Sequence, residues 1–300
     1  MPIEQPLEVR PLPIELSFIL GEGLTWDCRR QRLLMTDILA KLVFEIDIST
    51  YAFTSWKMPE EVGWVLPTEE CHRYAVGLRS GIATFDPRSP KQLHWINCEF
   101  PASLHIRLND ACTDSFGRIW YGSMSHEDSN RAEGKIASYE PDEGLKLHDS
   151  GFSVTNGPVI NADATYLFLN DSLQGTIYRY CFSLATGTIR GREVFAQFPS
   201  SDGMPDGMCF DDSGCLWVAM WSGSKVILLD PSGKLCGEIA IPAANVTNVC
   251  FCGEALDRLI VSTAATLDAS GKVVVPGLLY EVHGHGSAGT STTPCDLAKR

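Results

Sequence analysis

Four oxygen-bearing side chains occur at the same point of a recurring sequence phrase, a pattern that predicts a metal site. Glu22 and Asp206 carry carboxylates and Asn109 and Asn156 carry amides, each at the start of an apolar run typical of a β-strand. Carboxylate and amide oxygens suit hard cations such as Ca²⁺, Mg²⁺ and Mn²⁺. Two carboxylates brought together without compensation would repel each other, so their convergence predicts a bound divalent cation.

Each of these side chains also has a simpler interpretation. Asn and Asp beside Gly are favoured turn residues, and Asn156 and Asp206 both precede a glycine. The shared position of the four side chains in the repeat is what favours a site. For four further aspartates in Asp-rich stretches the turn interpretation is preferred: Asp110, Asp114, Asp163 and Asp212.

The phrase that carries these side chains recurs six times. It consists of a polar or Gly-containing turn, a short apolar run, an Asp/Gly turn and a second apolar run that often contains an aromatic residue. Successive copies start about 40 to 50 residues apart, which is the period of a four-stranded propeller blade. The six copies begin with residues 22–27, 62–66, 109–114, 156–160, 205–210 and 246–251.

We therefore expect an all-β fold, a six-bladed β-propeller of four-stranded blades around a central channel, formed by one domain over residues 1–300. The first strand of each blade lines the channel, so the four side chains should meet at one mouth. Blades two and six begin with 62–63 and 246–247 and offer no carboxylate there. Residues 7–12 should add a strand to the last blade, and the Gly/Ser/Thr-rich tail 284–300 should be partly flexible.

Composition excludes several classes of function. The chain has 24 Lys and Arg against 37 Asp and Glu, a formal net charge of −13, which argues against binding to nucleic acid or an anionic membrane. It has no apolar stretch of about 20 residues and no signal-peptide pattern, so we expect a cytoplasmic protein without an obligate protein partner. Its 11 cysteines form no CxxC pair, and we expect reduced thiols, with Cys250 and Cys252 on one face of a strand.

Several phrases resemble the SMP-30/gluconolactonase/regucalcin-like family. They are 22–27 (EGLTWD), 107–110 (RLND), 117–124 (GRIWYGSM), 156–157 (NG) and 205–208 (PDGM), and the resemblance runs in order from about residue 21 to 281. Two departures are the sequence NADA at 161–164, where members often have SPDG, and Ala111, where Gly is common. The resemblance implies a six-bladed propeller that binds one divalent metal in its channel and, in many members, hydrolyses sugar lactones.

The resemblance also implies roles for single residues. Glu22, Asn156 and Asp206 match the metal ligands, with Ca²⁺, Mg²⁺, Mn²⁺ and Zn²⁺ all left open as the ion. Arg107 and Asn109 match substrate-contacting positions. One more residue, Glu127, matches a polar position over the pocket.

These residues predict metal-dependent hydrolysis of a sugar-acid lactone to the open-chain acid. Asp206 would take the proton from water while it also binds the metal, and Arg107 would donate paired hydrogen bonds to the substrate. His126 and the segment 221–223 lie in loops where substrate choice would be set. No GxSxG or HExxH motif is present, which argues against serine and zincin chemistry.

Two alternatives share the same metal site. One is a related esterase or organophosphate hydrolase. The other is a Ca²⁺-binding regulatory or interaction propeller without turnover. The sequence does not distinguish which lactone or ring size would be used.

Overall fold

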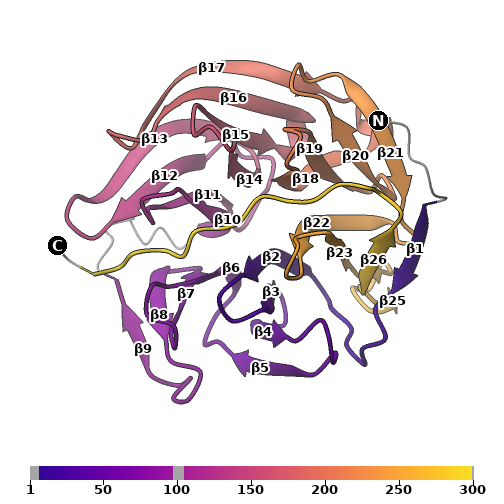
Figure 1. The fold of residues 1–300 in the computed structure, drawn as a ribbon, viewed down its shortest axis with the longest axis horizontal. Helices are drawn as coiled ribbons and strands as arrows, with labels where there is room; N and C mark the ends of the chain where they lie inside the picture. The colour runs from indigo at the N-terminus through magenta and orange to yellow at the C-terminus, as the bar shows by residue number, and fades with distance from the viewer. Residues whose placement is uncertain (1–6, 97–104, 299–300) are drawn as a thin grey trace.

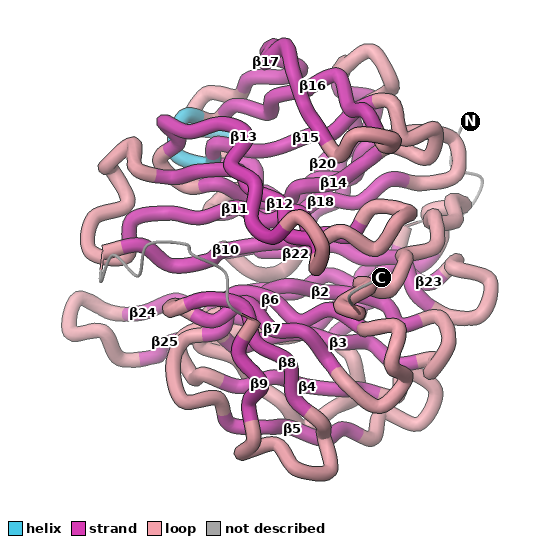
Figure 2. The backbone as a smooth tube through the Cα atoms, turned by 90° about the vertical axis from the view of Figure 1, so that its left-hand side faces the viewer, coloured by secondary structure: helices cyan, strands magenta, loops and turns pink. Residues whose placement is uncertain are grey.

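The computed structural model describes residues 7–96 and 105–298, which form six four-stranded antiparallel sheets (Figure 1). The sheets are arranged around a common axis as the blades of a propeller, which confirms the predicted fold. Figure 2 shows that the regular structure is almost entirely strand. In the described residues the helical elements are two 3-10 turns, η1 (Ser172–Gln174) and η2 (Ser200–Asp202).

Blades one to five each use four consecutive strands, ordered from the axis outward. Blade one contains β2 (Gly21–Asp27), β3 (Arg32–Asp37), β4 (Leu42–Ile46) and β5 (Phe53–Lys57). Blade two contains β6 (Val62–Pro67), β7 (Tyr74–Leu78), β8 (Gly81–Phe85) and β9 (Leu93–Trp95). Blade three contains β10 (Ile106–Thr113), β11 (Ile119–Ser125), β12 (Gly134–Glu140) and β13 (Gly144–Phe152).

The fourth and fifth blades follow the same order. Blade four contains β14 (Thr155–Ile160), β15 (Tyr166–Asp171), β16 (Thr176–Ser183) and β17 (Thr188–Gln197). Blade five contains β18 (Met204–Phe210), β19 (Leu216–Trp221), β20 (Lys225–Leu229) and β21 (Leu235–Ala240). A separate two-stranded hairpin, β24 (Thr266–Leu267) and β25 (Val273–Val275), projects from the sixth blade's connection.

Blade six closes the ring with strands from both ends of the chain. Its order is β22 (Asn245–Cys252), β23 (Arg258–Ala264), β26 (Leu279–His283) and β1 (Glu8–Pro11). Strand β1 pairs antiparallel with β26, and Figure 1 shows the two side by side. The predicted addition of residues 7–12 to the last blade is confirmed, and it leaves no gap between the first and last blades.

The hydrophobic core lies between neighbouring blades. Six clusters of buried apolar side chains each join one blade to the next, including the cluster between blades six and one. Both Cys250 and Cys252 pack into that last cluster, as predicted for two residues on one strand face. The ten cysteines within the described residues are all free thiols. No helix in the described part of the chain is long and apolar enough to cross a bilayer.

Every first strand contains a register shift near its start. The shifts fall between Glu22/Thr25, Val62/Trp64, Leu108/Ala111, Asn156/Val159, Pro205/Met208 and Val246/Asn248. A β-bulge turns the side chains beside it out of the regular alternation, and it uses glycine where the backbone takes positive φ. Gly23 and Gly157 have φ of 60° and 49°. The repeated bulge explains why the residues at the strand starts share one direction.

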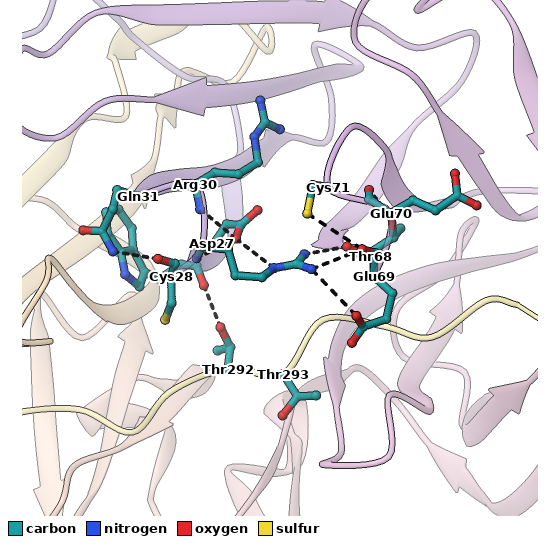
Figure 3. Close-up of polar contacts among 12 residues, drawn as sticks. Asp27, Cys28, Arg30, Gln31, Thr68, Glu69, Glu70, Cys71, Thr292 and Thr293 are labelled. Carbon is teal, nitrogen blue, oxygen red and sulfur yellow. Dashed lines mark hydrogen bonds and ion pairs between the residues drawn. The ribbon is translucent and has the colours of Figure 1, made fainter.

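The C-terminal segment lies across the opposite mouth, where the first strands end. Figure 1 shows it as the yellow trace crossing the middle of the ring. Thr292 Oγ1 donates to the Trp26 carbonyl at 2.6 Å, and Cys295 N donates to the Pro67 carbonyl at 2.8 Å. Figure 3 places Thr292 and Thr293 beside the blade-one turn. Composition predicts a partly flexible tail, which stays a prediction. Within it, residues 288–296 form hydrogen bonds with blades one, two, three, five and six.

Candidate active site

The predicted ligand residues meet at the mouth where the first strands begin. Glu22 in β2, Asn156 in β14 and Asp206 in β18 are 7%, 5% and 4% exposed. Asn109 in β10 is also buried and donates from Nδ2 to Asn156 Oδ1 at 2.6 Å. The structure therefore brings together side chains from blades one, three, four and five, which are far apart in the sequence.

Hydrogen bonds fix the orientation of both amides. Asn109 Nδ2 also donates to the Thr155 carbonyl at 2.8 Å, while Asn109 Oδ1 accepts from Arg107 Nη1 at 2.5 Å. Asn156 Nδ2 donates to Ser172 Oγ at 3.0 Å. Because Asn156 Nδ2 is committed to Ser172 Oγ, the atom of this amide that could bind a cation is Oδ1, which also accepts from Asn109 Nδ2.

The two carboxyl groups lack the partners that buried carboxylates normally have. Glu22 Oε2 accepts a long bond of 3.3 Å from the Gly23 N–H. Asp206 Oδ1 is buried without any hydrogen-bond partner in the part of the chain that the structure describes. Burying a carboxylate oxygen without a hydrogen-bond partner costs free energy, and a cation or hydrogen-bond donor bound to Asp206 Oδ1 would offset that cost.

Burial dominates the electrostatics of the site. It raises the pKa of Glu22 well above its ordinary value, and the nearby carboxylates of Asp206 and Asp110 raise that pKa further. Burial, followed by Asp110, likewise raises the pKa of Asp206, against the opposing effects of the Gly207 N–H and Arg107. A bound cation would reverse these shifts by favouring both charged forms.

The donor set fits a divalent cation. Two carboxylates and one amide oxygen are hard ligands, and the partnerless Asp206 Oδ1 provides a free coordination atom. Among the described residues, no three His, Cys, Asp or Glu side chains gather in an arrangement that could hold a metal. The amide of Asn156 is therefore needed to complete a three-residue set.

Asp110 is a buried carboxylate that the sequence interpretation missed. It was expected in an Asp-rich turn, but it lies inside β10 and accepts from the N–H groups of Ala111 and Gly157 at 2.8 and 2.9 Å. Burial raises its pKa to about 6, and these two N–H donors oppose the rise. Its place immediately after Asn109 was the available signal, since the bulge turns consecutive residues inward.

For Asp114 the turn interpretation is correct. Its Oδ1 accepts the backbone N–H groups of Phe116 and Arg118, and its Oδ2 accepts from Arg118 Nε and Trp120 Nε1. These contacts close the turn that links β10 to β11. Asp163 and Asp212 are exposed and lie away from the buried carboxyl groups.

Arg107 lies at the start of β10 with its guanidinium against the carboxyl groups. Its Nη1 donates to Asn109 Oδ1 and, at 3.3 Å, to the Leu108 carbonyl. Burial lowers the pKa of Arg107, and the carboxylates of Glu22, Glu61 and Asp206 oppose that effect. Of these three, Glu61 directly precedes β6, so blade two does bring a carboxylate to this mouth, contrary to the sequence interpretation.

Glu127 lies apart from the buried cluster. It follows β11, its side chain is 50% exposed, and its oxygen is 2.7 Å from His105 Nδ1. His126, also in this loop, has its Nδ1 3.3 Å from Glu61 Oε2. The structure joins Arg107 and Asn109 directly and leaves Glu127 in the loop above them.

Two supporting residues were not identified from sequence. Asn170 in β15 donates from Nδ2 to the Asp206 carbonyl at 2.5 Å, and Ser172 in η1 holds Asn156. Asn170 lies near the end of the second strand of blade four and Ser172 directly follows that strand, where no local pattern distinguishes them from ordinary turn residues. Only the contact with another blade reveals their role.

A cavity of about 400 Å³ lies along the axis beyond the cluster. Its lining includes Asp110, Gly157 and Asn248 on the side of the cluster, and Thr292 and Thr293 of the C-terminal segment on the other. The C-terminal segment therefore covers the end of this cavity that lies opposite the strand starts.

The chain is similar to known lactonases over most of its length. It is 34% identical to pentonolactonase XacC of Haloferax volcanii over 254 residues, which are 84% of this chain and 84% of the relative. It is 31% identical to the 6-deoxy-6-sulfogluconolactonase of Pseudomonas putida over 248 residues, 82% of this chain and 84% of the relative.

The fold is also similar to that of a solved enzyme structure. A solved luciferin-regenerating enzyme superposes with a TM-score of 0.91 at 27% sequence identity, covering 97% of this chain and 100% of that one. Residues 20–265 match the family model described as the SMP-30/Gluconolactonase/LRE-like region. With this match across all six blades, the chain belongs to the SMP-30/gluconolactonase/LRE-like family.

Proposed function

We propose that this chain is a metal-dependent lactonase that opens the ring of a sugar-acid lactone. The observation that carries the proposal is the buried Asp206 Oδ1, which has no hydrogen-bond partner among the described residues and lies near a second buried carboxyl, Glu22. Supporting it, both curated relatives described above are named as lactonases. Family membership alone would not distinguish turnover from cation binding.

The residues that would hold the ion are Glu22, Asn156 and Asp206. When bound, a divalent ion would polarise the lactone carbonyl and favour the negative charge that develops on its oxygen. Ca²⁺, Mg²⁺, Mn²⁺ and Zn²⁺ are the candidates. The all-oxygen donor set favours the first three over Zn²⁺.

Asp206 is the proposed general base. As the water oxygen bonds to the lactone carbonyl carbon, the carboxylate takes the water proton. The bond from that carbon to the ring oxygen then breaks, and the proton returns to the ring oxygen as it leaves. The product is the open-chain hydroxy acid. Within the described residues Asp206 Oδ1 has no hydrogen-bond partner, so this oxygen is available to accept the proton.

Arg107 and Asn109 would position the substrate. Within the described residues Arg107 uses only Nη1 for hydrogen bonds, so its Nε and Nη2 can donate as a pair to a substrate oxygen. Asn109 fixes both Arg107 and Asn156 through its own amide, which links substrate positioning to the ligand set. Glu127 would contribute from the loop above.

The experiment is a proton-release assay over a panel of aldonolactones with each of the four cations. We expect hydrolysis that is lost on chelation and restored by one or more of the ions. Saturating metal should also raise the melting temperature, because a ligand at 100 times its Kd stabilises the native state by about 2.7 kcal/mol.

The same panel separates the alternatives. Turnover of phosphotriesters or simple esters in preference to lactones would favour a related esterase. Metal-dependent stabilisation without turnover of any lactone or ester would favour a regulatory cation-binding propeller and reject the lactonase proposal.

A further inference from the structure

Glu61 is a partly buried carboxylate beside the proposed substrate region that the mechanism above does not use. It immediately precedes β6, and its carbonyl accepts the Arg79 N–H at 3.0 Å, which anchors its backbone. Its side chain is only 19% exposed. Its Oε2 is buried and makes no hydrogen bond in the described residues, although His126 Nδ1 lies 3.3 Å away.

The packing of blade two on blade three places Glu61 close to Arg107. A Cβ built on Gly63 would lie 2.6 Å from both the Leu108 and the Asn109 carbonyl oxygens, so the first strands of these blades touch at this point. Both strands begin at the same mouth. Glu61, two residues before Gly63, therefore lies level with the start of β10, where Arg107 is located.

The loop after β11 adds to this contact from above. Arg107 pairs with Met124 across the β10–β11 ladder, and His126 N donates to the His105 carbonyl at 2.6 Å. His126 is thereby held over the start of β10, and its ring reaches Glu61. Arg107, Glu61 and His126 form one polar group on the side of the site away from Asn156.

The positive charge of Arg107 is already opposed without a substrate. A divalent cation would offset Glu22 and Asp206, Asp110 adds a further buried carboxyl to the cluster, and the Glu61 carboxylate acts on Arg107 from blade two. A neutral hydroxyl can accept from the free Arg107 donors at no electrostatic cost. A carboxylate or sulfonate brought to the same donors would meet the like charge of Glu61, whose Oε2 makes no hydrogen bond within the described residues and lies 3.3 Å from His126 Nδ1.

We propose that Glu61 is a specificity-determining residue that makes the site prefer lactones with an uncharged distal end over lactones that carry a distal carboxylate or sulfonate. This inference rests on the proposed lactonase function and names its substrate class. In this proposal the negative charge of Glu61 affects which substrate binds, and Glu61 takes no part in the reaction step.

The test compares Glu61→Gln with the unmodified protein on two substrates, D-glucono-1,5-lactone, which is neutral, and D-glucaro-1,4-lactone, which has a distal carboxylate. We expect the unmodified protein to have the higher kcat/KM on the neutral lactone. Removing the charge should raise kcat/KM for the anionic lactone by about tenfold or more, mainly through KM, and change the neutral lactone less than about threefold.

The matched control is Glu60→Gln. It removes the same charge from the adjacent residue, whose Oε1 accepts from the Ser80 N–H at 2.9 Å. Its ratio of neutral to anionic kcat/KM should equal that of the unmodified protein. An equal shift in both variants would mean that net charge, and not the position of Glu61, sets the preference, and would overturn the proposal.

A binding measurement separates this proposal from the lactonase proposal. Calorimetric titration of the metal-loaded protein with D-glucarate and with neutral D-glucitol reports the charge preference without turnover. If no lactone is hydrolysed but Glu61→Gln still shifts binding toward D-glucarate, the lactonase proposal fails and the role of Glu61 stands. An unchanged preference, or no binding of either compound by both proteins, overturns the role of Glu61.

Discussion

Buried carboxylates lie at both ends of the first strands, but only one end gives them partners. Where the strands finish, Asp211 accepts the N–H groups of Ser213 and Cys215 and the indole of Trp217, and Asp114 is similarly surrounded. Where the strands start, Glu22 has one long bond and Asp206 Oδ1 has none in the described chain. Both ends carry carboxylates, but the number of hydrogen-bond donors around these carboxylates differs.

This difference in hydrogen-bond partners distinguishes the carboxylates that stabilise the fold from those proposed to bind a ligand. A carboxylate that accepts several N–H bonds stabilises the turn around it, since each bond replaces one lost to water. A pair of carboxyl groups buried without such bonds destabilises the metal-free protein. Aspartates at the strand ends therefore stabilise the fold, and the carboxyls at the strand starts are the ones proposed to bind a ligand.

The largest contrast should come from equivalent substitutions at the two ends. Asp206→Asn should reduce kcat/KM for lactone hydrolysis by about 10³-fold or more, because the base and one ligand are lost together. The melting temperature of the metal-free variant should stay the same or rise, because a repelling carboxyl is removed. Proton release and thermal unfolding measure the two effects.

Asp211→Asn is the control for that contrast. The new amide N–H₂ can face the Trp217 Nε1 donor, so the variant should lose about 1–3 kcal/mol of unfolding free energy while the folded protein keeps its activity. Full activity in Asp206→Asn would contradict the proposed division between the two ends.

A second prediction concerns the buried ion pair at the end of β10. Arg118 Nε is 2.7 Å from Asp114 Oδ2, and both side chains are almost fully buried. Asp114→Asn should lower the unfolding free energy by up to about 3–5 kcal/mol, because it removes the close partner of a buried guanidinium and leaves the more distant Glu140 Oε2 at 3.9 Å. Denaturant titration measures the loss.

Pairing this change with Arg118→Met tests the cause. The double variant should be less destabilised than the sum of the two single variants, since the uncompensated charge is gone. Additive losses would show that the ion pair is not what stabilises this turn.

The smallest prediction is a pH effect near the same turn. His148 stacks on Trp120 at a ring distance of 4.5 Å, and burial lowers its pKa to about 4 from an ordinary value of 6.5. Between these two pH values the unfolded chain binds a proton at this position that the native state does not, so stability falls as the pH decreases.

His148→Gln should reduce the fall in melting temperature between pH 7 and pH 4.5, while the exposed His72→Gln should not. Activity at pH 7 should be unchanged in both variants, because His148 lies in the outer strand β13, next to Ser138 of β12, and away from the proposed ligands. An unaltered pH profile in His148→Gln would remove this residue from the acid sensitivity of the fold.

Much of the architecture was predictable because its causes are local. The apolar runs, the Gly/Asp turns and the spacing of the six phrases are all properties of short segments, and they correctly predicted the blades and the closing strand β1. The shared position of Glu22, Asn156 and Asp206 also correctly predicted that they would lie at one mouth. Their roles as ligands stay predictions.

What local pattern could not predict was the set of partners from other blades. Asp110 and Asp114 look alike in the sequence, yet one accepts the N–H of Gly157 from blade four and the other closes its own turn. Glu61 looks like a loop residue until Gly63 packs against the backbone of blade three. The composition of the C-terminal segment does not reveal that it forms hydrogen bonds with the turns at the mouth where the first strands end.

The six-bladed ring and the shared position of Glu22, Asn156 and Asp206 could be predicted from the amino-acid sequence, because periodicity and turn chemistry act over a few residues. Only the tertiary structure decided which of those carboxylates are satisfied, which are left without partners, and which one lies beside Arg107. Those outcomes depend on burial and on hydrogen bonds between blades, and neither exists until the ring has closed.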